Sequence, residues 1–328
     1  MTLTINIKVR TCIPLAVALC LLLMTINACK APENIFTIGV IASTSAGNTA
    51  YEGFLAEMTH AGYVEGRNIR YIFKGVNEED EQDVDSRIRE LLGQDIDLLL
   101  SFGRRGSFRS KELTKGTDMP VLFCGNAWPV EDGLVESINH PGGNITGVKP
   151  ANSIAKALEW LKYIVPGLRK VWAPYYPDEN LSAAELPGLE KAASQLGIEL
   201  VLAEIRSIKE AVAAIENLPE DIDAIFRLPT GVIDPKNAEI SQAAIKRRIP
   251  VGASIQMDDA VLITLTNDFY NAGEKTARLA QQIHKGIKPA DLPIETSEVK
   301  LIINLRTAEE IGLNIPDDML GLATTVIR

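Results

Sequence analysis

A strand, a polar turn and a helix follow one another between residues 36 and 63, and this succession constrains the fold more than any other feature of the sequence. Residues 36–41 form an apolar run rich in β-branched side chains, typical of a strand that is covered on both faces of a parallel sheet. From Tyr51 onward, apolar side chains recur at helical spacing until Gly62, a residue type that often ends a helix. The succession therefore predicts an α/β fold.

The polar turn lies where a ligand would bind. In open parallel sheets ligands bind beyond the carboxyl ends of the strands, and the turn opens with Ser43, Thr44 and Ser45. These hydroxyl groups, together with the free N–H groups of the following helix, are able to hold a carboxylate. An ordinary strand-to-helix connection with a capping residue explains the same sequence, so both interpretations stay open.

Strands and helices alternate along the chain in two halves that match. Gly62 and Gly197, and Asp97 and Asp223, are among the corresponding positions, which lie 126 to 135 residues apart. This indicates one folding unit used twice. Further strands are predicted at 68–73, 95–101, 120–123, 171–176, 198–205, 221–226 and 299–305, and further helices begin near 77, 107, 183, 209, 270 and 307.

The repeat predicts two Rossmann-like, doubly wound parallel-sheet lobes joined by a three-segment hinge. We expect the chain to cross between the lobes near 149–153, 266–269 and 295–300, with residues 264–268 interpreted as a second polar break. The predicted lobes are 35–149 with 268–296, and 150–267 with 297–328. Strand ends that face each other across a hinge form a cleft, a common place for a small-molecule site.

The N-terminal segment resembles an export signal. Lys8 and Arg10 precede the apolar run 12–24, which is shorter than the ~20 residues that a membrane span needs. Residues 1–28 are therefore predicted to be a signal peptide. The sequence around Cys29 resembles a bacterial lipobox, which predicts lipidation of Cys29 and a tether over 29–34. Cleavage near Ala28 without lipidation is the alternative.

Net charge argues against a nucleic-acid partner, and the cysteine content argues against a disulfide framework. The whole chain has 33 Lys and Arg against 43 Asp and Glu. Because residues 1–28 carry two basic side chains and no acidic one, the remainder has a net charge of −12. Nucleic acid is an improbable partner for such a surface. Cys124 is the one cysteine beyond Cys29, so no disulfide framework is expected, and its apolar neighbours predict a buried side chain.

No catalytic set is apparent in the sequence. The three histidines, His60, His140 and His284, do not lie beside a nucleophile or in metal-ligand spacing. The common hydrolase, metalloprotease and dithiol motifs do not occur. We therefore expect a protein that is not an enzyme and that uses no metal or cofactor.

Several longer motifs point to one known family. They are Gly53-Phe54, residues 61–68 (AGYVEGRN), 133–135 (GLV), 140–147 (HPGGNITG), 161–166 (LKYIVP), 285–294 (KGIKPADLPI) and 304–308 (NLRTA). With these motifs the chain resembles the ABC-transporter substrate-binding lipoproteins of the tryptophan- and tyrosine-type uptake family, which have the type I periplasmic-binding-protein fold. The resemblance covers nearly all of the chain after the N-terminal segment.

Two strand-end loops depart from the family pattern. Residues 126–129 read Asn-Ala-Trp-Pro where relatives often carry Asp-Pro, and residues 229–232 read Pro-Thr-Gly-Val where many have Thr-Asp-Asn. An aspartate that relatives offer is thus missing, and an identical ligand is not implied.

The resemblance implies that ligand contacts come from strand-end loops. Ser101 and Arg104 are candidates to complete a carboxylate clamp with the hydroxyl turn, since a guanidinium pairs with a carboxylate in a fixed fork. Gly103 is a further candidate for a ligand contact in the same loop. A solvated charge at the start of a helix is the alternative for Arg104.

Aromatic and further polar side chains complete the candidate site. Trp128 and Tyr175 lie at loops of opposite lobes and are suited to stacking on a flat ligand, although packing within the lobes explains them equally well. Asp268 is a candidate for a ligand amine or, equally, a helix cap. Asn126, Thr230 and Ser254 are the remaining polar candidates.

The expected function is an extracytoplasmic, membrane-anchored solute receptor of an ABC importer, which hands a small solute to a permease and its ATPase. An aromatic amino acid or a similar zwitterion is the expected ligand, and a monomer is the expected state. A ligand-sensing module for a signalling partner is the alternative, and a doubly wound transferase is a weaker one because no catalytic set is present.

Overall fold

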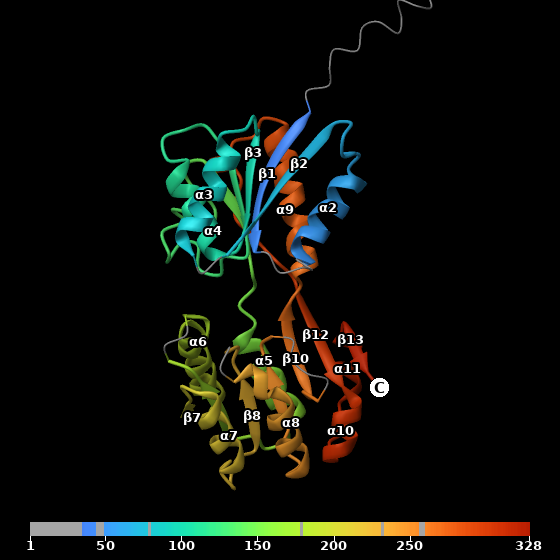
Figure 1. Ribbon diagram of the computed structural model, residues 1–328. Coiled ribbons are helices and arrows are strands. Elements are labelled where there is room, and N and C mark those ends of the chain that lie inside the picture. Colours follow the sequence, from blue (N-terminus) through green and yellow to red (C-terminus); the bar gives the residue numbers. More distant parts are fainter. Residues whose placement is uncertain (1–34, 44–48, 78–79, 178–179, 231–232, 256–259) are drawn as a thin grey trace, which may run out of the picture.

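The computed structural model describes residues 35–43, 49–77, 80–177, 180–230, 233–255 and 260–328. Two α/β lobes lie end to end, with a narrow connection between them (Figure 1). The predicted signal peptide, the tether and Cys29 lie outside the described residues. Within the described part of the chain, no helix is both long and apolar enough to cross a bilayer.

The first lobe is built on a parallel sheet in the order β11-β5-β4-β3-β1-β2. Its elements are β1 (Phe36–Ser43), α2 (Thr49–His60), β2 (Ile69–Val76), α3 (Glu81–Leu92), β3 (Leu98–Phe102), α4 (Arg104–Leu113), β4 (Val121–Cys124), β5 (Ile145–Lys149), α9 (Phe269–His284), the 3₁₀ turn η2 (Pro289–Asp291) and β11 (Glu295–Thr296).

The second lobe is built on a sheet in the order β13-β12-β10-β9-β8-β6-β7, in which β12 and β13 run antiparallel to the other strands. Its elements are α5 (Ile154–Ile164), β6 (Lys170–Tyr175), α6 (Asn180–Leu196), β7 (Glu199–Glu204), α7 (Ile208–Glu216), β8 (Ala224–Arg227), the 3₁₀ turn η1 (Asp234–Lys236), α8 (Asn237–Lys246), β9 (Val251–Ala253), β10 (Ile263–Asn267), β12 (Val299–Asn304), α10 (Leu305–Ile311), α11 (Asp317–Leu322) and β13 (Thr325–Ile327).

The two sheets share the order of their first five strands. The first five strands of each lobe follow the sequence 2-1-3-4-5 of doubly wound proteins. The predicted fold class, two doubly wound lobes, is therefore confirmed. In both lobes an aspartate that precedes the third strand accepts backbone hydrogen bonds from the start of the first strand. The Asp97 carboxylate accepts the N–H of Thr37, and the Asp223 carboxylate accepts the N–H groups of Arg169 and Lys170.

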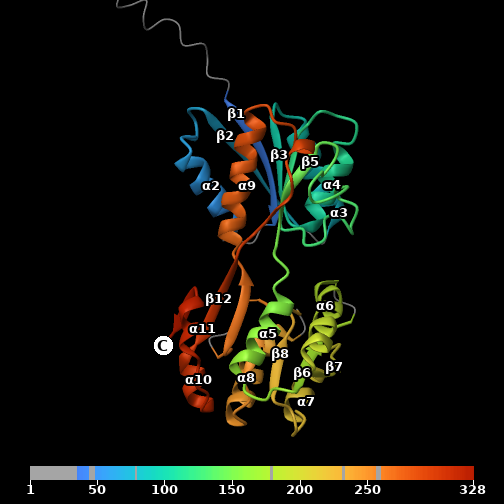
Figure 2. The same cartoon turned by 180° about the vertical axis from the view of Figure 1, so that it is seen from behind.

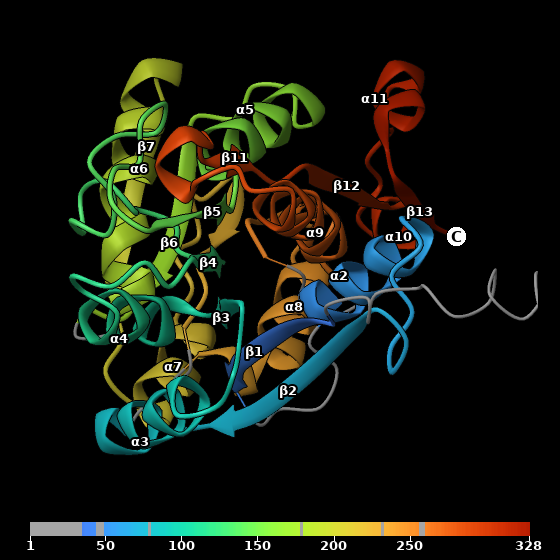
Figure 3. The same cartoon turned by 90° about the horizontal axis from the view of Figure 1, so that it is seen from above.

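Successive strand residues face opposite sides of each sheet, because side chains alternate along a strand. In β1, Ile38 and Val40 pack with α2 and α9, whereas Ile41 packs with α3. In the second lobe, α5 and α6 share a core with one face of the sheet, and α7 and α8 share a core with the other. Seen from above, α2 and α9 lie side by side, across the sheet from α3 and α4 (Figure 3).

Three segments join the lobes (Figures 1 and 2). They run from β5 to α5, from β10 to α9 and from β11 to β12. The Oδ1 atom of Asn267 accepts the backbone N–H of Ala151 at 2.7 Å and the hydroxyl of Ser297 at 3.1 Å. One amide oxygen thus links all three segments.

Some elements differ from the sequence-based expectation. Residues 264–268, predicted to be a polar break, lie mostly in β10, where Thr264 and Thr266 are buried. Threonine is β-branched and fits a covered strand when its neighbours bury it. The helix predicted from residue 107 begins at Arg104, because Gly103 has φ 102°, a conformation that lets the chain turn directly from β3 into α4.

Candidate functional site

A cavity of about 790 Å³ lies between the lobes, beyond the carboxyl ends of their strands. Its size falls in the range of sites for small ligands, ~300–1,000 Å³. Both lobes and the hinge line it. The lining residues are Gly125, Ala127–Glu131, Ser137, Ile138, Lys149–Ile154, Glu185, Gly188, Ser254, Ile255, Asn267 and Phe269.

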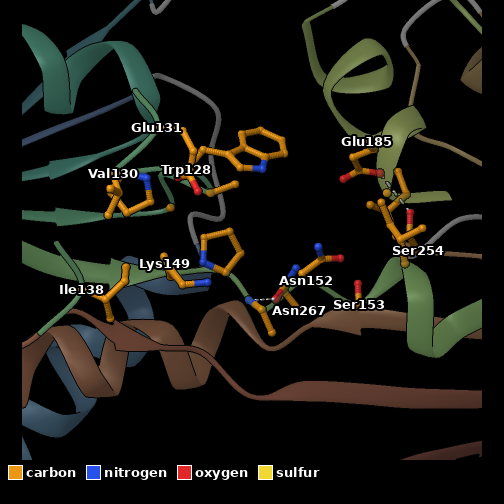
Figure 4. A pocket seen from close by; sticks show the side chains of 18 of the residues that line it. Trp128, Val130, Glu131, Ile138, Lys149, Asn152, Ser153, Glu185, Ser254 and Asn267 are labelled. Carbon is orange, nitrogen blue, oxygen red and sulfur yellow. Dashed lines mark hydrogen bonds between the residues drawn. The ribbon is translucent and has the colours of Figure 1, made fainter. Parts of the chain in front are cut away.

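Trp128 forms the wall on the first lobe. The buried Asn126, just beyond β4, accepts the backbone N–H of Trp128 on its side-chain oxygen at 2.9 Å, which fixes the turn that carries the indole. The Trp128 carbonyl accepts the N–H of Asp132 and closes the loop. Figure 4 shows the indole extending into the cavity, toward the second lobe. An aromatic face is therefore available to a flat ligand.

Glu185 of α6 and Ser254 form the opposite wall (Figure 4). The Ser254 hydroxyl donates a hydrogen bond to the Glu185 carboxyl at 3.3 Å. Burial raises the pKa of Glu185 to about 7, and the hydrogen bond from Ser254 lowers it by a smaller amount. Burial thus favours the protonated carboxyl more than it does in an exposed glutamate.

The hinge forms the floor of the cavity. Lys149, Asn152 and Ser153 belong to the first crossing segment, and Asn267 belongs to the second. The side chain of Asn267 is held by its contacts with Ala151 and Ser297. A ligand in this cavity would therefore contact the segments that join the two lobes.

A smaller cavity of about 230 Å³ adjoins the first and shares Gly125 and Phe269 with it. It is lined by the ends of three neighbouring strands and the start of α2. Ser43 and Gly103, two of the predicted site residues, belong to this lining, as does Cys124. Burial raises the pKa of the Cys124 thiol to about 11, so it is a neutral apolar wall and not a nucleophile.

Three further predicted residues are buried near strand ends without lining either cavity. Ser101 lies in β3 and Thr230 follows β8, and neither hydroxyl has a hydrogen-bond partner among the described residues. Asn126, already described, supports Trp128.

Tyr175, another predicted site residue, lies at the end of β6 and packs against the core of the second lobe. This is the packing alternative considered from the sequence.

Two predicted charged residues are engaged by other parts of the protein. Arg104 donates two hydrogen bonds to Asp132, at 2.8 and 2.7 Å, and this pairing lowers the pKa of the Asp132 carboxyl. The Asp268 carboxylate caps α9 by accepting the N–H of Asn271 at 3.0 Å, and it pairs with Lys300 at 3.0 Å. Neither residue lines the cavities. Thr44 and Ser45 lie outside the described residues.

Sequence reasoning missed several lining residues, including Glu185, Glu131, Lys149 and Asn152. For Glu185 a signal is present in the sequence. Along α6 it is in helical register with Leu189, Ala192 and Leu196, so a carboxyl group stands at one end of an apolar stripe. The hinge residues carry no such signal, because their proximity depends on how the lobes are joined.

No group of histidine, cysteine and acidic side chains suited to a metal ion occurs in the part of the chain that the structure describes. His284 stacks on Phe36 with ring centroids 4.2 Å apart and hydrogen-bonds to the Tyr63 hydroxyl at 2.8 Å. Its role is therefore packing in the first lobe, away from the cavity.

Comparison with known proteins is informative over nearly the whole chain. Residues 36–327 match the family described as ABC transporter substrate binding protein. A tyrosine-binding protein from Clostridioides difficile (strain R20291) is 27% identical over 267 residues, which are 80% of this chain and 76% of that protein.

Two solved structures have the same two-lobed architecture. An ABC domain in complex with L-Trp from Streptococcus pneumonia is 24% identical with a TM-score of 0.72, over 90% of this chain and all of that one (100%). A ligand-free, open structure of a substrate-binding protein with adhesive properties from Clostridium difficile is 23% identical with a TM-score of 0.80, over 89% and 99% of the two chains. At these identities the similarity establishes the fold.

Proposed function

The chain belongs to the family of ABC transporter substrate-binding proteins, and from this premise we propose that its interlobe cavity binds an aromatic amino acid for import. Members of this family bind a solute and perform no chemistry on it. The observation that carries the proposal is the position of Trp128, whose indole extends into a cavity that both lobes and the hinge line.

The geometry suits an aromatic zwitterion. The indole offers a face for stacking, the hydroxyl side chain of Ser43 lines the adjoining small cavity, and Glu185 with Ser254 offers polar groups on the other lobe. The names of two similar proteins add support, since one is a tyrosine-binding protein and the other was solved with L-Trp. A ligand that touches both lobes favours their closure, which is the signal that a permease can read.

We propose the following residue ranges for the two lobes. The first lobe comprises 35–149 with 268–296, and the second comprises 150–267 with 297–328. The continuity of α9 and β11 with the first sheet supports this division. The three crossing segments act as the hinge.

The proposed partners are a membrane permease and its ATPase. Lipidation of Cys29 after removal of residues 1–28 would hold the protein at the outer face of the membrane, with 29–34 as a tether. Membrane fractionation of Cys29→Ser against the unaltered protein tests the anchor: the variant is expected in the soluble fraction, and an unchanged membrane fraction would contradict lipidation.

Isothermal titration calorimetry of the purified protein tests the ligand. We expect L-tryptophan, L-tyrosine or L-phenylalanine to bind with micromolar or tighter affinity, and L-leucine and L-alanine to bind at least about tenfold more weakly, since one aromatic contact contributes about 1 kcal/mol beyond its buried area. Tight binding of an aliphatic amino acid or a sugar, with no heat from the aromatic set, would refute the proposal.

A further inference from the structure

Glu185 is an unusual residue in its helix. It occupies the cavity end of the stripe formed by Leu189, Ala192 and Leu196, and the neighbouring Leu189 and Ala192 are buried in the core of the second lobe. A carboxyl group placed at the border of such a core loses much of its hydration. Unless it is protonated or paired with a cation, this loss is costly.

The described residues provide no cation for Glu185. Among the described residues, its carboxyl accepts a hydrogen bond from the neutral hydroxyl of Ser254. The charged groups on the described elements packed against α6 have other partners. On α5, Lys156 pairs with Glu159 and Lys162 donates to the Leu196 carbonyl, and on β6 and β7, Lys170 pairs with Asp221 and Glu199 while Glu204 pairs with Arg206.

The cavity itself contains two other ionisable lining residues, Glu131 on the first lobe and Lys149 on the hinge. Lys149 forms no ion pair with Glu185 in the described part of the structure, and Glu131 is itself an acid. The Glu185 carboxyl is directed into the cavity and toward the indole of Trp128 on the opposite wall (Figure 4). Among the described residues, the cavity thus presents a carboxyl that is not paired with a cation on one side and an aromatic face on the other.

We propose that Glu185, supported by Ser254, receives the ammonium group of the bound amino acid, while the aromatic ring of the ligand stacks on Trp128. This inference rests on the proposed function and adds a specificity-determining residue on the second lobe. Because the ligand then joins α6 to the loop after β4, pairing at Glu185 contributes to holding the lobes closed.

Pairing at Glu185 makes ligand binding depend on pH. Glu185 pairs with an ammonium group only when it is ionised, and in the free protein its pKa is about 7. Ligand binding therefore releases a proton at pH 6. The affinity is expected to fall about tenfold between pH 8 and pH 6, as the fraction of ionised carboxyl falls.

Calorimetric titration with L-tryptophan at pH 6, 7 and 8, in two buffers of different ionisation enthalpy, tests this expectation. The unaltered protein should release close to one proton at pH 6. In Glu185→Gln, the affinity at pH 8 should fall at least tenfold and the pH dependence should disappear. Glu190→Gln is the matched control, because Glu190 is exposed on the same helix, and it should behave as the unaltered protein does.

A matched pair of ligands isolates the ammonium group. Indole-3-propionate has the ring and the carboxylate of tryptophan without the amine. The unaltered protein should prefer tryptophan at pH 8, and Glu185→Gln should lose most of that preference. Circular dichroism melting of each variant shows that it is folded.

The outcomes separate the two proposals. Proton uptake on binding, unchanged tryptophan affinity in Glu185→Gln, or loss of the pH dependence in Glu131→Gln instead would overturn the role of Glu185 and leave the proposed function intact. An unaltered protein that binds no amino acid at any pH would overturn the proposed function together with this inference.

Discussion

At the scale of single residues, the backbone of Trp128 is fixed by its immediate neighbours. The buried Asn126 holds the backbone of Trp128, and the pairing of Arg104 with Asp132 anchors the same loop to α4. The indole is therefore presented to the cavity before any ligand arrives, which lowers the entropic cost of binding.

Trp128→Ala is expected to weaken the binding of the best aromatic ligand by about ten- to a hundredfold, because a stacked ring and its buried area are both lost. Trp128→Phe should recover part of this loss. Both are measured by calorimetry.

Tyr163→Ala provides the control for removing a ring. Tyr163 is 54% exposed on α5 and does not line the cavity, so its removal should leave the affinity unchanged. Equal affinities for the Trp128→Ala variant and the unaltered protein would exclude stacking on Trp128.

Arg104 and Asp268 illustrate what residue type alone does not reveal. Both have the chemistry for binding a zwitterion, and both lie beside residues that line a cavity. In the fold, Asp132 and Lys300 are their partners. Those partners lie 28 and 32 positions away in the sequence, so the pairing depends on tertiary structure. Their part in ligand binding stays a prediction.

At the scale of elements, α2 and α9 make the closest helix contact, and two glycines permit it. A Cβ atom on Gly273 would lie 1.8 Å from the Ala50 carbonyl oxygen, and one on Gly53 would lie 2.1 Å from the Tyr270 carbonyl oxygen. These contacts give a physical reason for the Gly53-Phe54 motif, since the helices could not approach each other with any larger residue.

Gly273→Ala is expected to lower the free energy of unfolding by about 3 kcal/mol, because the helices must separate to accommodate the methyl group. The sign is informative, since intrinsic helix propensity alone would favour alanine by ~1 kcal/mol. Denaturant unfolding monitored by circular dichroism measures the change.

Gly321→Ala is the matched control in α11. A Cβ atom there would meet nothing within 4 Å, so a gain of about 0.5–1 kcal/mol is expected. If both variants were stabilised, the close contact between α2 and α9 would be wrong.

Elements were predictable from the sequence where hydrophobic periodicity was strong and flanked by glycine or polar breaks, as for β1, α3 and β3. Residues 263–267 were not, because alternating threonines in a short strand resemble a polar turn until the neighbouring strands bury them. The repeated aspartates, Asp97 and Asp223, were visible as a match in sequence, and the structure gives them the same role at the start of β1 and β6.

At the scale of the whole molecule, the amide of Asn267 connects the three segments between the lobes. Asn267→Ala removes the acceptor for a backbone N–H and for a hydroxyl. We expect the free energy of unfolding to fall by about 1–2 kcal/mol and the distribution of lobe separations in the ligand-free protein to broaden. Small-angle scattering and spin-label distances between the lobes measure the second effect.

Asn217→Ala is the corresponding amide control. The side-chain amide of Asn217 donates a hydrogen bond to the Ala213 carbonyl at the end of α7. This amide forms no hydrogen bond with the three crossing segments in the described part of the structure. Its loss should leave the lobe separation unchanged. A narrow, unaltered distribution in Asn267→Ala would mean that the three segments set the hinge without this amide.

The sequence by itself determined the two doubly wound lobes, because apolar periodicity and glycine positions are local properties that repeat along the chain. It also identified the strand-end loops, since parallel sheets place them on one edge. Only the tertiary structure decided which side chains face the cavity and which are already paired. Trp128 and Glu185 lie in different lobes and become opposite walls through three hinge crossings, so their relation depends on long-range packing that no local pattern encodes.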